Sequence, residues 1–597
     1  MLVDYTRDNL LTNFSKATLQ DRYLLPEEKN QDLFARVASH YSNDEYHAQR
    51  IYDYISKLWF MPATPILSNG GTTRGLPISC FLSESEDHMQ GIADTWNENI
   101  WLAQKGGGIG TYWGNVRSMG EKIGNVGKSS GVIPFMKVQD ALTLAISQGS
   151  LRRGSAALYL PIWHPEVEDF IDMRRPTGGD PNRKALNLHH GIAVDDKFMT
   201  AVKNDTTYDL KSPKTGASIH TVKARDLWAK LLTTRIETGE PYLLFIDTVN
   251  KAIPEHHKQL GLKVKTSNLC SEITLPTGID HLGANRTAVC CLSSVNLEKY
   301  DEWKDNESFI LDIMYFLDNV LQDFIDTAET THSKARYAAM RERSVGLGVM
   351  GLHYLYQARG LPFGSKEAYL LNKEIFVHLN TATKLANKHI ALDRGACPDA
   401  NDCDIMVRFS NTMAVAPTAS ISVICGGSSP GIEPTMANVY THKTSGGNFE
   451  VHNPHLKKVL EALDKDTDEV WTSIAMHEGS VQHLDFLDDH TKEVYKTFEE
   501  IEQMDIIHQA GDRQPYIDQS QSVNVLLRPD CSKRYLHMIH MKAWELGLKS
   551  LYYCRSVSLQ RADKPSKMNE RNTIAECENG VCTIPEPVKY EECVACQ

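Results

Sequence analysis

The segment Ser267–Ile273 (SNLCSEI) places three reactive side-chain types at alternate positions. In an extended conformation, Asn268, Cys270 and Glu272 point to the same side. A thiol flanked by an amide and a carboxylate supplies a one-electron or nucleophilic centre, a hydrogen-bonding group and a base. The same residues also fit a structural alternative, a buried cysteine with a loop-capping asparagine and a surface glutamate.

The other cysteines do not form a secreted disulfide pattern. The chain has 13 cysteines, an odd number, and most are isolated in the sequence. Residues 556–597 are polar, so we expect a mobile tail there. Its four cysteines, at 577, 582, 593 and 596, have a spacing that also suits a zinc knuckle.

Composition excludes several classes of protein. The formal net charge of −13 over 597 residues gives no polycationic surface for nucleic acid. The N-terminus does not read as a signal peptide, and no apolar run approaches the ~20 residues of a membrane span. A cytoplasmic protein without nucleic-acid or membrane partners is expected. The pair His256-His257 lacks the i, i+4 spacing of a helical zinc site, and no metal ligand is predicted in this chain.

Hydrophobic periodicity predicts the elements that must position these residues. Residues 1–70 read as short helices, one starting at Pro26 and one covering 51–60, and the best helix lies near 313–324. Strand-like runs occur at 156–163, 242–246, 345–350 and 523–527. Strands separated by helices indicate an α/β core with largely parallel strands.

Eight short motifs occur in an order that resembles the large, catalytic subunit family of ribonucleotide reductases. Besides the SNLCSE segment they are Pro62–Gly71, Leu76–Cys80, Ala288–Leu297, Arg341–Gly351, Ala416–Ser422 with Arg513–Ser522, Gly547–Tyr553, and the C-terminal EECVACQ. The resemblance covers residues 60–597. Each motif is weak alone, but the ordered set is specific.

The resemblance implies catalytic roles for five residues. Cys270 matches the cysteine that becomes a thiyl radical and abstracts the 3′-hydrogen of the ribose. Glu272 matches the carboxylate that takes the 3′-OH proton, and Asn268 matches the amide that holds the 2′- and 3′-hydroxyls. Cys80 and Cys290 match the pair that protonates the departing 2′-OH and ends as a disulfide. Cys291 stands where threonine is commoner, and we expect it to be structural because strand neighbours face opposite sides.

It also implies sites for substrate phosphates and for radical and thiol transfer. The phosphate cradle matches Thr64, Ser79 and the run Pro417, Thr418, Ala419, Ser420, Ile421 and Ser422. Tyr552 and Tyr553 match a stacked pair that carries the radical to the finger cysteine, and consecutive stacking requires a local irregularity of the strand. Cys593 and Cys596 match tail thiols that re-reduce the disulfide and are recharged by thioredoxin or glutaredoxin.

The resemblance also implies binding sites for allosteric effectors. Asp87, Arg117 and Arg153 match positions that bind ATP or dNTP effectors with Mg²⁺. Many family members carry an N-terminal ATP-cone of roughly 90 residues, a small-domain size. Cys80 lies too near the start of the chain for one, so we expect no inhibition by dATP through such a domain.

The implied fold is a ten-stranded α/β barrel, two five-stranded parallel halves around a central finger loop. The expected division is a helical region over 1–70, the barrel over 71–525, a segment with the two tyrosines over 526–555, and a redox tail over 556–597. The resemblance implies that a class I homodimer without a covalent cofactor reduces ribonucleoside diphosphates. Its radical is expected to come from a separate metal-containing small subunit. The alternatives are a class II reductase using adenosylcobalamin and a zinc-binding scaffold without enzymatic activity.

Overall fold

The computed structural model describes most of the chain. It covers residues 1–556 except 126, 149–151, 154, 445–446 and 529–530, together with two short strands, β22 (Glu576–Glu578) and β23 (Val581–Thr583). No helix in this described part combines the length and apolar character needed to cross a membrane.

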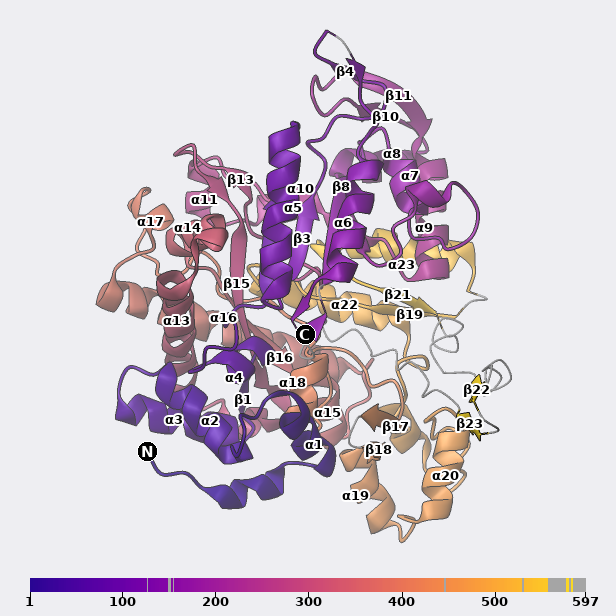
Figure 1. Ribbon diagram of the computed structural model, residues 1–597. Helices are drawn as coiled ribbons and strands as arrows, with labels where there is room; N and C mark the ends of the chain where they lie inside the picture. Colours follow the sequence, from indigo (N-terminus) through magenta and orange to yellow (C-terminus); the bar gives the residue numbers. More distant parts are fainter. Residues whose placement is uncertain are drawn as a thin grey trace.

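Five parallel strands form the first half of the central sheet. In spatial order they are β2 (Cys80–Glu84), β3 (Gly108–Tyr112), β8 (Ser155–Pro161), β9 (His189–Val194) and β12 (Tyr242–Phe245). Helices in the connections, among them α5 (Met89–Gln104), α6 (Ile133–Ala145) and α9 (Ala224–Thr238), lie against this half (Figure 1). Helical crossovers are what parallel neighbours require.

The second half repeats this arrangement with shorter pairing. β15 (Ala288–Asn296) runs parallel to β16 (Val345–Met350), and parallel bridges Leu347–Met413 and Val415–Gln521 carry the sheet onward. β19 (Val525–Leu527) then pairs in parallel with β21 (Cys554–Ser556), which continues the line of β20 (Ser550–Leu551).

The two halves meet at antiparallel seams. β15 pairs antiparallel with β2 on one side, and β12 pairs antiparallel with β20 on the other. A backbone hydrogen bond from Tyr552 N to Val523 O (2.8 Å) joins β20 to the neighbouring strand of the second half. The sheet therefore curls round on itself, and the predicted ten-stranded barrel is confirmed.

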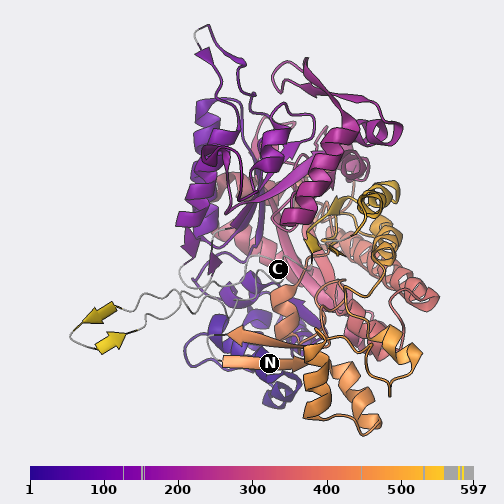
Figure 2. The ribbon, with the colours of Figure 1, turned by 90° about the vertical axis from the view of Figure 1, so that its right-hand side faces the viewer.

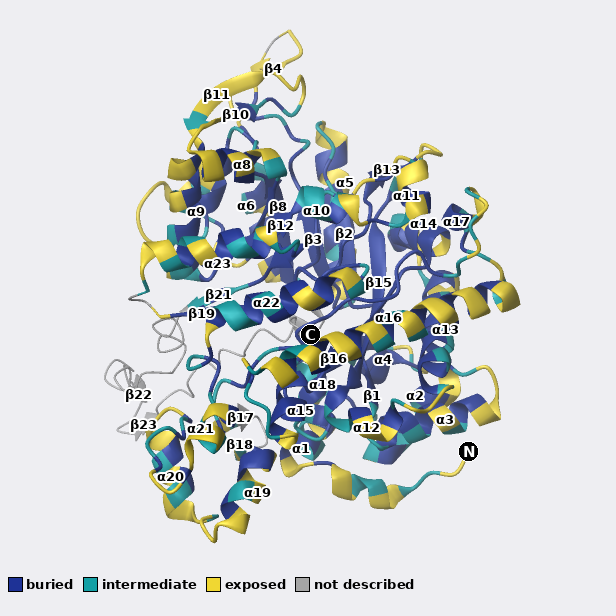
Figure 3. Ribbon diagram, turned by 180° about the vertical axis from the view of Figure 1, so that it is seen from behind, coloured by how far each residue is buried: buried dark blue, intermediate teal, exposed yellow. Residues whose placement is uncertain are grey.

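Long helices cover the outside of the second half. α13 (Phe309–Thr327) and α16 (Lys366–Arg394) pack against each other, and α16 also contacts α22 (Gln503–Arg513). In Figure 3 the barrel strands such as β2, β3 and β15 are dark blue, whereas the helices outside them carry yellow residues. The apolar stripe predicted near 313–324 is the buried face of α13.

The N-terminal helices contact a small unit that lies in the chain between the barrel segments near residues 415 and 521. This unit contains β17 (Val439–Thr444), β18 (Gly447–His452), α19 (Pro454–Ala462) and α20 (Asp468–Met476). β17, α19 and α20 contribute side chains to an apolar cluster of their own. Phe14 of α1 (Asn13–Arg22) packs on His442 with ring centroids 4.5 Å apart. Figure 2 shows the orange unit beside the indigo helices.

Two sequence predictions in the N-terminal region were wrong. No helix starts at Pro26, because residues 25–28 form a turn in which Glu27 has φ +67°. α2 begins only at Asn30 (Asn30–His40). The helix predicted over 51–60 ends at Ser56 (α3, Glu45–Ser56), and Phe60 starts β1 (Phe60–Pro62). Leu58 has φ +62°, a conformation that a helix cannot continue through.

Candidate active site

A loop without regular structure passes through the barrel and carries Cys270. Residues 266–275, which we call the finger, are all buried. Strands on different sides of the barrel hold its backbone: the Tyr159 hydroxyl donates to Asn268 O (2.9 Å), the Ser550 hydroxyl to Ser271 O (2.8 Å), and Ser520 N to Glu272 O (2.9 Å). The finger is therefore fixed by hydrogen bonds to β8, to β20 and to the segment around residue 520.

One glycine in β3 makes room for the finger. A Cβ at Gly110 would stand 1.7 Å from the carbonyl oxygen of Ser267, so no other residue fits without moving the loop. The finger itself turns sharply, since Ser271 has φ +67°. The sequence argument placed Asn268, Cys270 and Glu272 on one side by assuming an extended conformation. That assumption does not hold, because the centre of the segment is a turn.

Cys80 and Cys290 lie opposite each other across the seam between β2 and β15. They are register partners in the antiparallel ladder, which places their Cβ atoms roughly 4.5–5.5 Å apart, close enough for their sulfur atoms to approach. Neither thiol is in a disulfide. The finger reaches the pair through Asn268, whose Nδ2 donates to Cys80 Sγ (3.3 Å), and Gln519 Nε2 donates to Cys290 Sγ (3.5 Å).

Burial sets the protonation of the site. It raises the pKa of Glu272 to about 7, against the opposing effect of hydrogen bonds from Asn268 and Ser522. Glu272 Oε2 accepts from the Ser522 hydroxyl (3.2 Å), while Oε1 has no hydrogen-bond partner among the described residues. Burial also raises the pKa of the Cys290 thiol well above its usual range, so Cys290 carries its proton at neutral pH.

Family models match almost the whole barrel and the helices before it. The model of the ribonucleotide reductase barrel domain matches residues 78–406 and 403–554, and that of the all-alpha domain matches residues 9–75. The chain belongs to the ribonucleotide reductase large-subunit family.

Named relatives agree with this assignment. The chain is 41% identical to the ribonucleoside-diphosphate reductase large subunit of Invertebrate iridescent virus 3, over 94% of this chain and 96% of the viral protein. It is 32% identical to the large subunit of Caenorhabditis elegans, over 92% of this chain and 77% of the nematode protein. Among solved structures, the Actinobacillus ureae class Id ribonucleotide reductase alpha subunit matches with a TM-score of 0.82 and 35% identity, covering 94% of this chain and 99% of that one. These matches give no support to a cobalamin-dependent class II reductase or a zinc-binding scaffold.

Within this reductase subunit, Tyr552 and Tyr553 lie between β20 and β21, where the strand is interrupted. The break between the two strands is the predicted irregularity. The ring centroids are 4.2 Å apart, but the rings are tilted by 49° and not stacked as predicted. Tyr552 belongs to the same apolar cluster as Cys270 and Leu269.

The sequence analysis missed the groups that surround this tyrosine pair. Tyr242 of β12 lies 4.7 Å from Tyr552 and 5.1 Å from Tyr553 between ring centroids. The Tyr553 hydroxyl lies 3.4 Å from Nδ1 of His189, which in turn contacts Glu240 Oε1 at 2.6 Å. The only available signal was Tyr242 within a predicted strand, which gave no reason to place it beside residue 552.

The hydroxyl-bearing residues predicted for phosphate binding lie at two helix starts and beside Cys80. Thr418 has φ +55° at the start of α18 (Ala419–Ile424), and its Oγ1 accepts from Gly431 N (2.7 Å). Thr64 begins α4 (Thr64–Asn69), and its hydroxyl lies 2.8 Å from the hydroxyl of Tyr23. Tyr23 follows the last residue of α1, the helix that packs on α18. Ser79 adjoins Cys80, whose Sγ lies 3.7 Å from the Ser79 hydroxyl.

The predicted effector residues are only partly described. Arg117 Nε lies 2.9 Å from both carboxylate oxygens of Asp87, so this pair is formed within the chain. The side chain of Arg153 lies outside the described residues, as do Cys593 and Cys596.

Proposed function

We propose that this subunit reduces ribonucleoside diphosphates to 2′-deoxyribonucleoside diphosphates, using a thiyl radical at Cys270 and electrons from Cys80 and Cys290. The observation that carries the proposal is the register pairing of Cys80 with Cys290 directly beside the finger amide of Asn268. Two thiols in this position can deliver two electrons to one substrate carbon and close a disulfide without moving a strand.

The roles of the side chains follow from their protonation. The Cys270 thiyl takes the 3′-hydrogen of the ribose and becomes a thiol, while Glu272 accepts the 3′-OH proton. The 2′-hydroxyl takes up a proton from the Cys80–Cys290 pair and leaves as water. The pair then delivers its second hydrogen to C2′ with the two electrons and closes as a disulfide. Glu272 returns the proton to the 3′-oxygen, and Cys270 returns a hydrogen atom to C3′. The sum is ribonucleotide plus two thiols giving deoxyribonucleotide, disulfide and water.

The enclosed position of the finger supports radical chemistry. A thiyl radical must be kept from water and oxygen, and every residue from 266 to 275 is buried. Thr64, Ser79 and residues 417–422 are proposed to bind the diphosphate through hydroxyl and backbone N–H groups.

Partners complete the cycle. We propose that Tyr553 and Tyr552 pass the radical from a metal-containing small subunit to Cys270, and that Cys593 and Cys596 return electrons from thioredoxin or glutaredoxin. Asp87, Arg117 and Arg153 are proposed to bind ATP or dNTP effectors with Mg²⁺ in a homodimer. Because the reaction needs reduced thiols, a cytoplasmic location fits it.

The test is CDP reduction by the purified chain with a radical-generating small subunit, dithiothreitol and ATP. We expect product from the wild type, none from Cys270→Ala, and normal turnover from Cys403→Ala, a half-buried cysteine outside the finger. Equal activity of Cys270→Ala and wild type contradicts the radical role. Turnover restored by adenosylcobalamin alone, without a small subunit, contradicts the roles of Tyr552 and Tyr553.

A further inference from the structure

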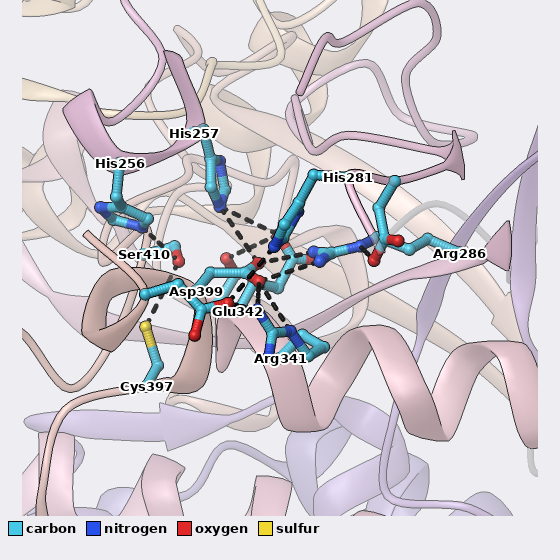
Figure 4. A network of polar contacts seen from close by, with 12 residues as sticks. His256, His257, His281, Arg286, Arg341, Glu342, Cys397, Asp399 and Ser410 are labelled. Atoms are coloured by element: carbon cyan, nitrogen blue, oxygen red, sulfur yellow. Dashed lines mark hydrogen bonds and ion pairs between the residues drawn. The ribbon is translucent and has the colours of Figure 1, made fainter. Parts of the chain in front are cut away.

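A cluster of charged side chains lies where α11 (Glu255–Gln259), α14 (Ser333–Glu342) and α17 (Pro398–Asn401) meet, beside the hairpin that ends in Arg286. Figure 4 shows imidazole, carboxylate and guanidinium groups converging there. We call this set the His257 cluster; its members are His257, His281, Glu342, Asp399 and Asp402, with Arg286, Arg341 and Asp280 bonded to them.

The positive charges of the cluster do not balance its carboxylates. Asp280, Glu342, Asp399 and Asp402 bring four carboxylates, whereas Arg286 and Arg341 bring two guanidinium groups. Burial raises the pKa of Glu342 to about 8, so that carboxyl largely keeps its proton at neutral pH. With the histidines neutral and the other three carboxylates ionised, the cluster has a charge of −1, and a divalent cation that displaced the Glu342 proton would balance all four carboxylates.

Two side chains in the cluster have polar atoms that no described residue satisfies. His257 is 1% exposed, and neither of its ring nitrogens has a hydrogen-bond partner. Glu342 is fully buried, and its Oε1 is unpartnered as well. His257 Nε2 lies 3.9 Å from Glu342 Oε2 and 3.8 Å from Asp399 Oδ2, too far for hydrogen bonds.

These separations suit atoms that share a metal ion. Ligands at about 2.0–2.2 Å from a tetrahedral ion stand roughly 3.4 Å from one another. The two separations from His257 Nε2, 3.9 and 3.8 Å, would have to shorten by about half an ångström, and the Glu342 and Asp399 carboxylates would have to turn toward a common point. On the solvent side, ligand atoms of His281, Asp399 and Asp402 all lie within 4.8 Å of one another.

We propose that His257, Glu342 and Asp399 bind one divalent first-row metal ion, with His281, on the solvent side of Asp399, as the fourth ligand and Asp402 beside it. Two imidazoles among carboxylates favour Zn²⁺ or a similar ion over Mg²⁺ or Ca²⁺, which prefer all-oxygen sites. Adjacent His256 takes no part, since its Nε2 contacts the Ser410 hydroxyl at 2.7 Å.

The arginines support this site as outer partners of a ligand. Arg286 Nη1 and Nη2 donate to the two oxygens of Asp399 at 2.6 and 2.9 Å, and Arg341 Nε donates to Asp399 Oδ1 at 2.8 Å. Hydrogen bonds of this kind orient a ligating carboxylate. Each guanidinium is shared with a second carboxylate, Asp280 or Asp402, so neither fully neutralises Asp399.

The site would anchor the approach to the finger. α11 lies a few residues before the finger, and the ion would tie it to α14 and α17, which come from distant parts of the sequence. The inference does not depend on the proposed activity, because it concerns metal binding by the purified chain alone.

The experiment measures metal binding by the full chain carrying serine at 577, 582, 593 and 596, which removes competing tail thiolates. After chelation and reloading with Zn²⁺, we expect one ion per chain by elemental mass spectrometry and a higher thermal midpoint. Co²⁺ in its place should give no thiolate charge-transfer band, because the ligands are nitrogen and oxygen.

Variants locate the ion. His257→Ala and the nearly isosteric Glu342→Gln should each weaken Zn²⁺ binding at least tenfold, whereas the neighbouring His256→Gln should bind as before. Failure of the tail-serine chain itself to bind Zn²⁺, Mn²⁺ or Co²⁺ overturns the proposal, whatever the folding of the variants. Unchanged binding by both folded ligand variants overturns it equally.

Discussion

Burial gives Glu272 a pKa of about 7, far above that of an exposed glutamate, and this places its titration within the working range of the enzyme. A proton acceptor must be ionised, and the ionised fraction falls as the pH drops through the pKa. We therefore expect kcat/KM for CDP to decrease below about pH 7 in the wild type.

Glu272→Gln removes the acceptor while keeping its shape. Loss of a general base typically costs about 10²–10⁴-fold in rate, and the residual activity should lose its acidic limb. A pH profile of kcat/KM for both proteins tests this. A glutamine variant that retains the wild-type rate and pH dependence would remove Glu272 from the mechanism.

At the residue scale, the sequence predicted which candidate reactive groups lie together better than it predicted their surroundings. Alternation singled out Asn268, Cys270 and Glu272, although the segment proved to be a turn held by Ser271 at φ +67°. Gln519 and Ser522, which contact Cys290 and Glu272, stood within a quoted motif but received no role. No local pattern says which side chain of a loop reaches a cysteine some 230 residues away.

At the scale of elements, the register of β2 on β15 decides which cysteine lies opposite Cys80. Cys290 faces Cys80, whereas its neighbour Cys291 is the register partner of Val345 in β16. After turnover without external reductant, we expect peptide mass spectrometry to find a Cys80–Cys290 disulfide in the wild type.

The control is Cys291→Ser, which should form the same disulfide, while Cys80→Ser should form none. A Cys80–Cys291 link instead would show that the register is not the one used in catalysis.

Element types were largely predictable, because runs of apolar residues such as 345–350 became strands with the same bounds. The pairing of β2 with β15 was not, since barrel closure sets the register of strands about 200 residues apart. The helix predicted over 51–60 failed at Leu58, where a positive φ ended a periodicity that continued in the sequence.

At the scale of the whole molecule, closure of the barrel packs the finger directly against strand β3. Gly110→Ala would push a methyl group onto the Ser267 carbonyl. We expect a loss of stability of about 1–3 kcal/mol, as for other overpacked cores, and a larger loss of CDP reduction because the finger shifts.

Gly127→Ala is the matched control, since a Cβ there meets nothing within 4 Å. Thermal melting and turnover of both variants test the point. Full activity of Gly110→Ala would mean that the finger tolerates displacement.

The barrel itself was predictable only through the resemblance to a family, because periodicity indicated no more than an α/β core. The His257 cluster was beyond sequence reasoning altogether. Its side chains come from residues 257, 281, 342, 399 and 402, which no spacing rule connects, and the adjacent histidines argued against a metal site.

The seam between β2 and β15 couples the proposed reaction to the stability of the barrel. Cys80 belongs to one half of the barrel and Cys290 to the other. Each turnover would therefore link the two halves by a disulfide, and each reduction would break that link. A link closing a loop of about 210 residues restricts the unfolded chain by roughly 5 kcal/mol. The oxidised subunit would therefore have the larger free energy of unfolding. The supply of reductant would then govern the stability of the subunit as well as its rate of turnover.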